Sequence, residues 1–140
     1  MYAGCPILWK SSMQKLVALS TTEAEYIALS SALRKVIAII YLLEELIGKG
    51  FGIHSGTPNV KCKTFEDKKS CIEIAKNHKT RPRTKHLSVR LHHFCSHIVQ
   101  KTISIEHIST TEMLADILTK PLPTIQFEKL RDLIMGWTTS

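Results

Sequence analysis

The sequence lacks the cysteine pairs that build zinc ribbons and disulfide frameworks. The four cysteines, at positions 5, 62, 71 and 95, are far apart and form no Cys-x-x-Cys pair, so we expect free thiols. His92, His93, Cys95 and His97 lie closer together, and a helix would place His93 and His97 on one face. No second pair of ligands stands at a familiar spacing, so an ordinary helix with exposed histidines is favoured over a metal site.

Long uncharged apolar runs are also lacking. The longest apolar stretch, residues 36–47, is interrupted by Glu44 and Glu45, whereas a membrane span needs about 18 or more apolar residues. The first residues show no basic region followed by an apolar core, so they do not form a secretion signal. We therefore expect an intracellular, cytoplasmic protein that does not interact with a membrane.

No repeat, low-complexity tract or Gly/Ser linker divides the 140 residues. A chain of this length is long enough for one globular domain. The sequence therefore predicts a single domain over residues 1–140.

Acidic residues are lacking between Glu73 and Glu106, although the chain has twelve in total. Seven basic residues lie in this acid-free segment, and they account for the whole formal net charge of +7. They are Lys76, Lys79, Arg81, Arg83, Lys85, Arg90 and Lys101. A patch of one sign attracts phosphates through counterion release, although a solvated basic face without a ligand is an equally good explanation.

Helical spacing of apolar residues predicts a long helix from Thr22 to Ile47, with a capping box at Thr22 and Glu25 and a break near residues 34–36. Further helices are expected at 70–75, 87–100 and 111–118, the first opened by a second capping box at Ser70 and Glu73. Pro121 and Pro123 precede an amphipathic helix at about 124–135, for which Thr124 is the expected cap.

Alternation of apolar and polar residues predicts strands at 60–65 and 103–108, and the short apolar run at 7–9 predicts another. Strands separated by helices indicate an α/β fold. Because such crossovers are right-handed and join parallel strands, we expect 60–65 and 103–108 to form a largely parallel pair.

Three acidic residues fall at the ends of these elements. Glu25 lies in the first turn of the long helix, Asp67 follows the strand at 60–65, and Asp116 lies early in the helix at 111–118. Each has a structural explanation, since acidic residues complement the dipole of a first helical turn and aspartate is common in turns. Ligands of open α/β sheets gather at the carboxyl ends of strands, so a functional cluster of the three is the alternative.

Four ordered motifs carry a resemblance to a known family. They are VALSTTEAEYIAL at 17–29, EDKKSCIEIA at 66–75, RTKHLSVRLHHF at 83–94 and ADILTKPL at 115–122. They resemble VALSSTEAEYxAL, EDNQSAxxLA, RTKHIDxRYHF and ADxLTKPL of the ribonuclease H domain in Pol polyproteins of copia-type LTR retrotransposons. Because the motifs run in order through most of the chain, the resemblance is highly specific.

The resemblance implies a function and a site. Enzymes of this superfamily hold two Mg²⁺ ions, or Mn²⁺, with four carboxylates and hydrolyse the RNA strand of an RNA–DNA hybrid. Glu25, Asp67 and Asp116 would be the catalytic, metal-binding residues of this chain. The residues that would contact nucleic acid are Arg81, Arg83, Lys85, His86 and Arg90. A reverse transcriptase domain would precede the chain in the intact polyprotein, and a virus-like particle or the nucleus becomes an alternative location.

The chain departs from the family pattern in the missing strands, beside Asp67, and at Ser88, which replaces an acidic residue of the family. The family's first strand carries an aspartate that bridges both metals, and neither that strand nor the next has a counterpart in this sequence. We therefore expect an incomplete ribonuclease H-like fold, truncated at its N-terminus, with a mixed sheet flanked by helices. Lys68 and Lys69 replace the family's Asn-Gln beside Asp67, which places cations near a metal ligand.

These departures predict a domain fragment with a motif-bearing core at about 4–122 and a C-terminal helix at about 124–135, inactive by itself. A non-catalytic remnant of a transposon polyprotein that binds nucleic acid through its basic segment is the alternative. A remnant with only a structural role is a third reading. Only catalysis requires Glu25, Asp67 and Asp116 to converge on metal.

Overall fold

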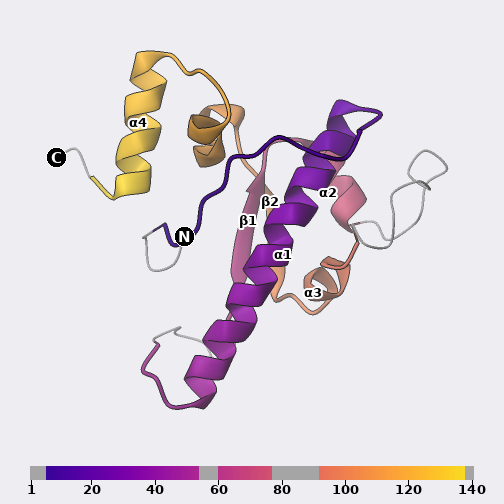
Figure 1. Cartoon of the computed structure of the whole chain (residues 1–140), viewed down its shortest axis with the longest axis vertical. Helices are drawn as coiled ribbons and strands as arrows, with labels where there is room; N and C mark the ends of the chain where they lie inside the picture. The colour runs from indigo at the N-terminus through magenta and orange to yellow at the C-terminus, as the bar shows by residue number, and fades with distance from the viewer. Residues whose placement is uncertain (1–5, 54–59, 77–91, 138–140) are drawn as a thin grey trace. The chain divides into compact units, whose positions relative to one another are not determined.

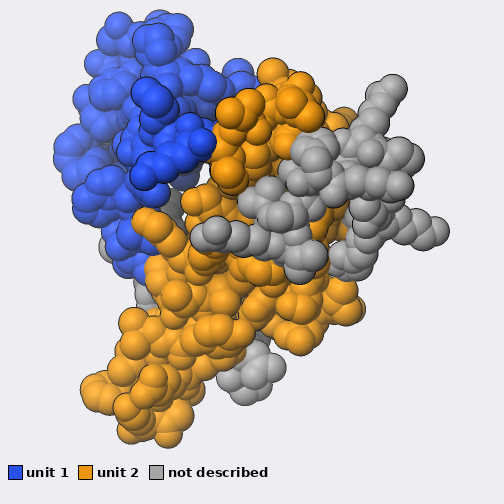
Figure 2. Space-filling view, turned by 45° about the vertical axis from the view of Figure 1, so that its right-hand side comes forward, with its two compact units in different colours: residues 1–15, 108–140 blue, residues 16–107 orange. Residues whose placement is uncertain are grey.

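The computed structural model describes residues 6–53, 60–76 and 92–137 (Figure 1). By internal contacts the chain divides into two compact units, coloured separately in Figure 2. The larger unit comprises Leu16–His107, and the terminal unit comprises Met1–Lys15 with Ile108–Ser140. That residues 1–140 form a single domain stays a prediction.

The larger unit combines helices with a two-stranded sheet. Its elements are α1 (Thr21–Gly48), β1 (Cys62–Glu66), α2 (Lys69–Lys76), α3 (Cys95–Val99) and β2 (Ile103–His107). The strands pair in parallel, with Cys62 opposite Ile103 and Glu66 opposite His107. The predicted parallel pair is thus confirmed, with β1 ending one residue later than expected. The mixed α/β class is confirmed as well.

Helix α1 is the longest element (Figure 1) and supplies one side of the core of the larger unit. Its buried apolar residues recur at helical spacing, as Tyr26, Leu29, Leu33, Ile37 and Ile40. The other buried members of this core are Ile27, Val60, Cys71, Ile72, Ala75, Phe94, Ile103 and Ile105. The predicted break near residues 34–36 is wrong, because the apolar stripe continues through that region without proline or glycine.

Length and composition alone would allow α1 to cross a membrane. A core helix of a soluble protein meets the same criteria. Since the buried face of α1 packs with residues of α2 and β2, we interpret α1 as a core helix. The expectation that the chain does not interact with a membrane stays a prediction.

Two helices of the terminal unit differ from expectation. The helix predicted at 111–118 is instead two short 3₁₀ helices, η3 (Thr110–Glu112) and η4 (Leu114–Leu118). Met113 separates them because its backbone is extended, with ψ 101°. Helix α4 (Thr124–Met135) confirms the C-terminal helix, but its N-cap is Pro123 rather than Thr124. Gly136 ends α4 at a φ of 69°, a left-handed conformation that favours glycine.

Other local predictions are also wrong. Residues 7–9 form no strand, and Trp9 is 70% exposed; the apolar run is too short to mark a strand by itself. Helix α3 begins only at Cys95, since residues 92–94 are not helical, while 87–91 lie outside the described residues. Helix α2 already begins at Lys69, so Ser70 does not cap it.

Candidate catalytic carboxylate site

The start of α1 is capped by residues other than those predicted. The Ser20 hydroxyl accepts a hydrogen bond from the backbone N–H of Glu23 at 3.1 Å. The Glu23 carboxylate accepts one from the backbone N–H of Leu19 at 2.8 Å. The capping box predicted at Thr22 and Glu25 is therefore wrong. Because Glu23 performs the capping role, the carboxylate of Glu25 is available for another interaction.

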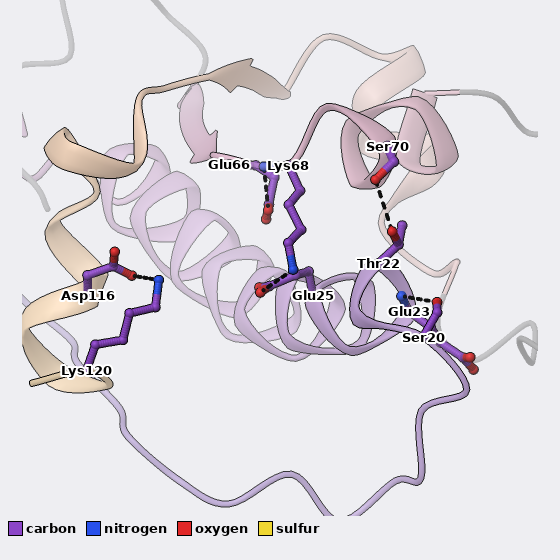
Figure 3. A network of polar contacts seen from close by, with 9 residues as sticks. All are labelled: Ser20, Thr22, Glu23, Glu25, Glu66, Lys68, Ser70, Asp116 and Lys120. Atoms are coloured by element: carbon purple, nitrogen blue, oxygen red, sulfur yellow. Dashed lines mark hydrogen bonds and ion pairs between the residues drawn. The ribbon is translucent and has the colours of Figure 1, made fainter.

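Glu25 forms an ion pair with Lys68, which lies in the turn that follows β1. The Lys68 ammonium nitrogen, Nζ, lies 3.2 Å from Glu25 Oε1 (Figure 3). Close by, the hydroxyls of Thr22 and Ser70 lie 3.0 Å apart and link the first turn of α1 to that of α2. The cation expected near the metal-ligand position is thus present, and it is in direct contact with Glu25.

Glu66 is a site residue that the sequence analysis missed. It is the last residue of β1, it is buried, and its Oε1 accepts a hydrogen bond from the backbone N–H of Lys68 at 3.2 Å. Burial raises the pKa of the Glu66 carboxyl; the hydrogen bond from Lys68 opposes this, and the nearby charges of Glu25 and Asp67 add to it. The alternation in β1 could have revealed Glu66, since it is in phase with the inward-facing Cys62 and Thr64.

Asp67 occupies the bend directly after β1, where the sequence analysis expected it. Its charge acts on Glu66, and so does the charge of Glu25. Glu25 reaches the same turn through its ion pair with Lys68, so two of the three predicted catalytic residues are positioned at the turn after β1.

Cys71 lies beside this site in the first turns of α2 and is fully buried. Burial raises the pKa of its thiol well above the usual range, and the charges of Glu66 and Glu25 raise it further. The thiol therefore stays protonated at neutral pH. A protonated thiol is neither a good nucleophile nor a good metal ligand.

Asp116, the third predicted residue, lies in η4 of the terminal unit. Its side chain is largely buried, and Asp116 Oδ1 lies 2.9 Å from Lys120 Nζ, one helical turn further along (Figure 3). Asp116 belongs to a different unit from Glu25 and Asp67, and the convergence of the three residues stays a prediction.

A second polar cluster joins two of the sequence motifs. The Tyr26 hydroxyl lies 2.6 Å from His92 Nδ1, and the Tyr26 ring lies 5.8 Å from that of Phe94. Burial raises the pKa of the Tyr26 phenol far above its usual range. The contact therefore involves a neutral phenol and connects the residue after Glu25 to the end of the RTKHLSVRLHHF motif.

The predicted nucleic-acid contacts belong to the acid-free segment. Arg81, Arg83, Lys85, His86 and Arg90 all lie outside the described residues. At the two ends of the acid-free segment, Lys76 and Lys101 are described and exposed. The basic contact surface stays a prediction.

The site is only partly suited to magnesium. Glu25, Glu66 and Asp67 offer the hard oxygen ligands that Mg²⁺ prefers. However, the Lys68 ammonium already contacts Glu25, and the described part of the chain contains no group of three or more acidic, histidine or cysteine residues arranged to hold a metal ion. In this arrangement the described residues do not fit a pair of metal ions.

Along most of its length the chain is similar in sequence to segments of transposon polyproteins. It is 38% identical over 133 residues to the retrovirus-related Pol polyprotein from transposon TNT 1-94 of tobacco, covering 95% of this chain and 9% of that protein. It is 32% identical over 123 residues to the Pol polyprotein from transposon RE2 of Arabidopsis thaliana, covering 88% and 8%. The Gag-Pol polyprotein of yeast transposon Ty1-JR2 is 27% identical over 121 residues, covering 86% and 6%.

These relatives confirm the resemblance at the level of the polyprotein. The chain is related to a segment of transposon Pol polyproteins, and it spans less than a tenth of the length of each of these relatives. No family model matches the chain. No solved structure matches it significantly either.

Proposed function

We propose that this chain is the C-terminal part of the ribonuclease H domain of a copia-type retrotransposon Pol polyprotein. In its intact form that domain hydrolyses the RNA strand of an RNA–DNA hybrid. The observation that carries the proposal is that the motifs at 17–29 and 66–75 meet in the fold. The hydroxyls of Thr22 and Ser70 lie 3.0 Å apart, and Lys68, which directly follows Asp67, contacts Glu25 at 3.2 Å.

The proposal assigns Glu25, Asp67 and Asp116 to the metal-binding set, with two Mg²⁺ ions, or Mn²⁺, as cofactors of the intact domain. Its substrate is an RNA–DNA hybrid, held by the basic residues at 81–90. A reverse transcriptase domain precedes it in the polyprotein, and its location is intracellular. Relatedness to long Pol polyproteins supports the existence of upstream domains.

We further propose that the 140 residues do not cleave the hybrid by themselves. They contain three of the four carboxylates that the family resemblance implies, and too little negative charge remains to hold two divalent ions against their mutual repulsion. The ion pair between Lys68 and Glu25 removes part of that charge. Small misplacements of catalytic groups already reduce rates strongly, so activity should be negligible.

Complementation tests this function. Purified chain is incubated with a labelled RNA–DNA hybrid and Mg²⁺ or Mn²⁺, alone and with a segment that supplies the first two strands and their aspartate. We expect metal-dependent cleavage of the RNA strand only in the complemented sample, and loss of cleavage in Asp67→Asn. Glu112→Gln, an exposed change outside the motifs, should leave cleavage intact.

Two outcomes would contradict the proposal in different ways. Cleavage by the chain alone that Asp67→Asn abolishes would show that the missing strands are dispensable. A complemented sample that binds the hybrid without cleaving it would favour the second candidate, a non-catalytic nucleic-acid-binding remnant. The pairing of Lys68 with Glu25 is the observation that favours this candidate, because it places an ammonium at a proposed metal ligand.

A further inference from the structure

We propose that Lys68 acts as an internal cation in the turn after β1, where it offsets the charge of Glu25 and weakens the binding of divalent ions there. The inference deepens the proposed function, since a divalent ion is expected at Glu25 only if that function is correct. It concerns Lys68, a residue at which this chain departs from the family pattern.

Lys68 contacts two carboxylates with two different groups. Its backbone N–H donates to Glu66 Oε1 and its ammonium contacts Glu25 Oε1, each at 3.2 Å. Glu66 ends β1 whereas Glu25 lies in α1, so a single residue links the two elements that position the acidic groups. The side chain reaches across from the turn toward α1 in Figure 3.

A cation at this position reduces the repulsion among the neighbouring acidic groups. Glu25, Glu66 and Asp67 place three acidic groups close together, and like charges at short range destabilise one another. In a metal site, divalent ions would offset this repulsion. In this chain the Lys68 ammonium supplies a permanent positive charge at the same place.

The geometry also sets up a competition. Mg²⁺ binds carboxylate oxygens at about 2.0–2.1 Å, so an ion on Glu25 Oε1 would lie within a few ångströms of the ammonium that already contacts this oxygen. The ammonium would have to move away or repel the ion. A single charge about 5 Å from a divalent ion in a water-like medium changes its affinity by roughly tenfold.

The family pattern has asparagine at position 68. Asparagine there would remove both the charge that offsets Glu25 and the repulsion of divalent ions. It removes the positive charge and offers an amide oxygen as a further ligand. The Glu25–Lys68 ion pair is more than one-third exposed on both sides, and pairs of this kind contribute little to stability. The variant Lys68→Asn should therefore keep its fold, and far-UV circular dichroism verifies this.

The test is a titration of the complete 140-residue chain with Mn²⁺, in which electron paramagnetic resonance measures the free ion. We expect weak binding by the unaltered chain, with no change in Glu25→Gln. Lys68→Asn should bind Mn²⁺ roughly tenfold more tightly, and adding Glu25→Gln should abolish this gain. Only the Lys68→Asn protein should show a melting temperature that rises with Mn²⁺ concentration.

Two control variants make the result specific. Lys68→Arg keeps the positive charge and should bind Mn²⁺ as weakly as the unaltered chain. Lys69→Asn removes the same charge from the adjacent, exposed residue and should have a much smaller effect. Lys68→Gln serves as a second neutral variant should Lys68→Asn lose its helical signal.

The inference is overturned if the unaltered chain already binds Mn²⁺ through Glu25, or if Lys68→Asn and Lys69→Asn raise affinity equally. Failure of the proposed function is a separate result. A complemented chain that does not cleave the hybrid would refute the ribonuclease H assignment even where Lys68→Asn gains Mn²⁺ affinity, because the titration requires no nucleic acid.

Discussion

The Tyr26 hydroxyl and His92 Nδ1 lie 2.6 Å apart, which ties the first turns of α1 to the segment that precedes α3. Tyr26 is fully buried and immediately follows Glu25, so this contact also fixes the backbone that carries the candidate catalytic carboxylate. The residues after Glu25 thus anchor the helix in the core, while the carboxylate itself reaches the turn after β1.

Tyr26→Phe should therefore lower the free energy of unfolding. The change removes a partly buried hydrogen bond and leaves His92 without this partner, at a cost of about 1–2 kcal/mol. Tyr41→Phe is the matched control, because the Tyr41 hydroxyl lies 3.4 Å from His97 Nε2 at an exposed position; its effect should stay within about 0.5 kcal/mol. Urea unfolding measures both, and equal losses would refute the special role of Tyr26.

The cap of α1 provides a second prediction. Ser20→Ala removes the acceptor for the Glu23 backbone N–H and should cost about 1 kcal/mol of stability. Thr22→Ala loses only the exposed contact with Ser70 and should cost about half as much or less. Thermal unfolding of the two variants decides whether Ser20 or Thr22 caps α1. A larger loss in Thr22→Ala would restore the cap that the sequence analysis placed at Thr22.

Glu66 should make stability depend on pH. Burial, together with the charges of Glu25 and Asp67, raises its pKa in the folded chain. A raised pKa means that the folded state binds the proton more tightly than the unfolded state does. The stability that Glu66 contributes is therefore fully present below the ordinary glutamate pKa. It is lost as the pH rises through the pKa of the folded chain. The groups facing it are Glu25, Asp67, Lys68 and Cys71.

Glu66→Gln should accordingly be more stable than the unaltered chain at neutral pH, since glutamine keeps the acceptor for the Lys68 N–H without a buried charge. The advantage should shrink as the pH falls toward the ordinary glutamate range of about 4.3. Denaturant unfolding between about pH 4 and pH 8 measures this difference. Glu44→Gln, an exposed change on α1, should show no such trend. A constant difference across this range would contradict the account.

From the basic residues of the acid-free segment we predict that the binding of nucleic acid depends on salt. Affinity for an RNA–DNA hybrid should fall steeply with salt, and neutralising Arg81, Arg83 and Lys85 together should flatten the slope by about two to three units if each contacts a phosphate. Neutralising the exposed lysines at positions 10, 15 and 35 is the control and should leave the slope unchanged. Fluorescence anisotropy at several salt concentrations measures the slopes. The reverse pattern would move the contact surface to another part of the chain.

The sequence predicted well those features that depend on periodicity. The apolar spacing from Tyr26 to Ile40 and the alternation at Ile103 and Ile105 determine which faces are buried, so α1 and β2 were expected close to their observed bounds. The segment at 111–118 failed because helical spacing over one or two turns does not separate an α-helix from 3₁₀ turns.

The site was predicted in part. The motifs identified Glu25 and Asp67, but the cap at Ser20 and the role of Glu66 depend on which backbone N–H groups each side chain reaches. Several acceptors near Thr22 compete for those groups, and the sequence does not rank them. That Lys68 contacts Glu25, rather than only lying near Asp67, follows from how α1 packs beside the turn, a tertiary relationship without a local signal.

The proposed function requires Glu25, Asp67 and Asp116 to form one metal site in the intact domain. A crystal structure of the chain in complex with the segment that supplies the first two strands would measure the separations of the three carboxylates directly. We predict that all three lie within about 12 Å of one another, because two-metal sites hold their ions about 3.5–4 Å apart. An Asp116 carboxylate farther than this from those of Glu25 and Asp67 would contradict the assignment.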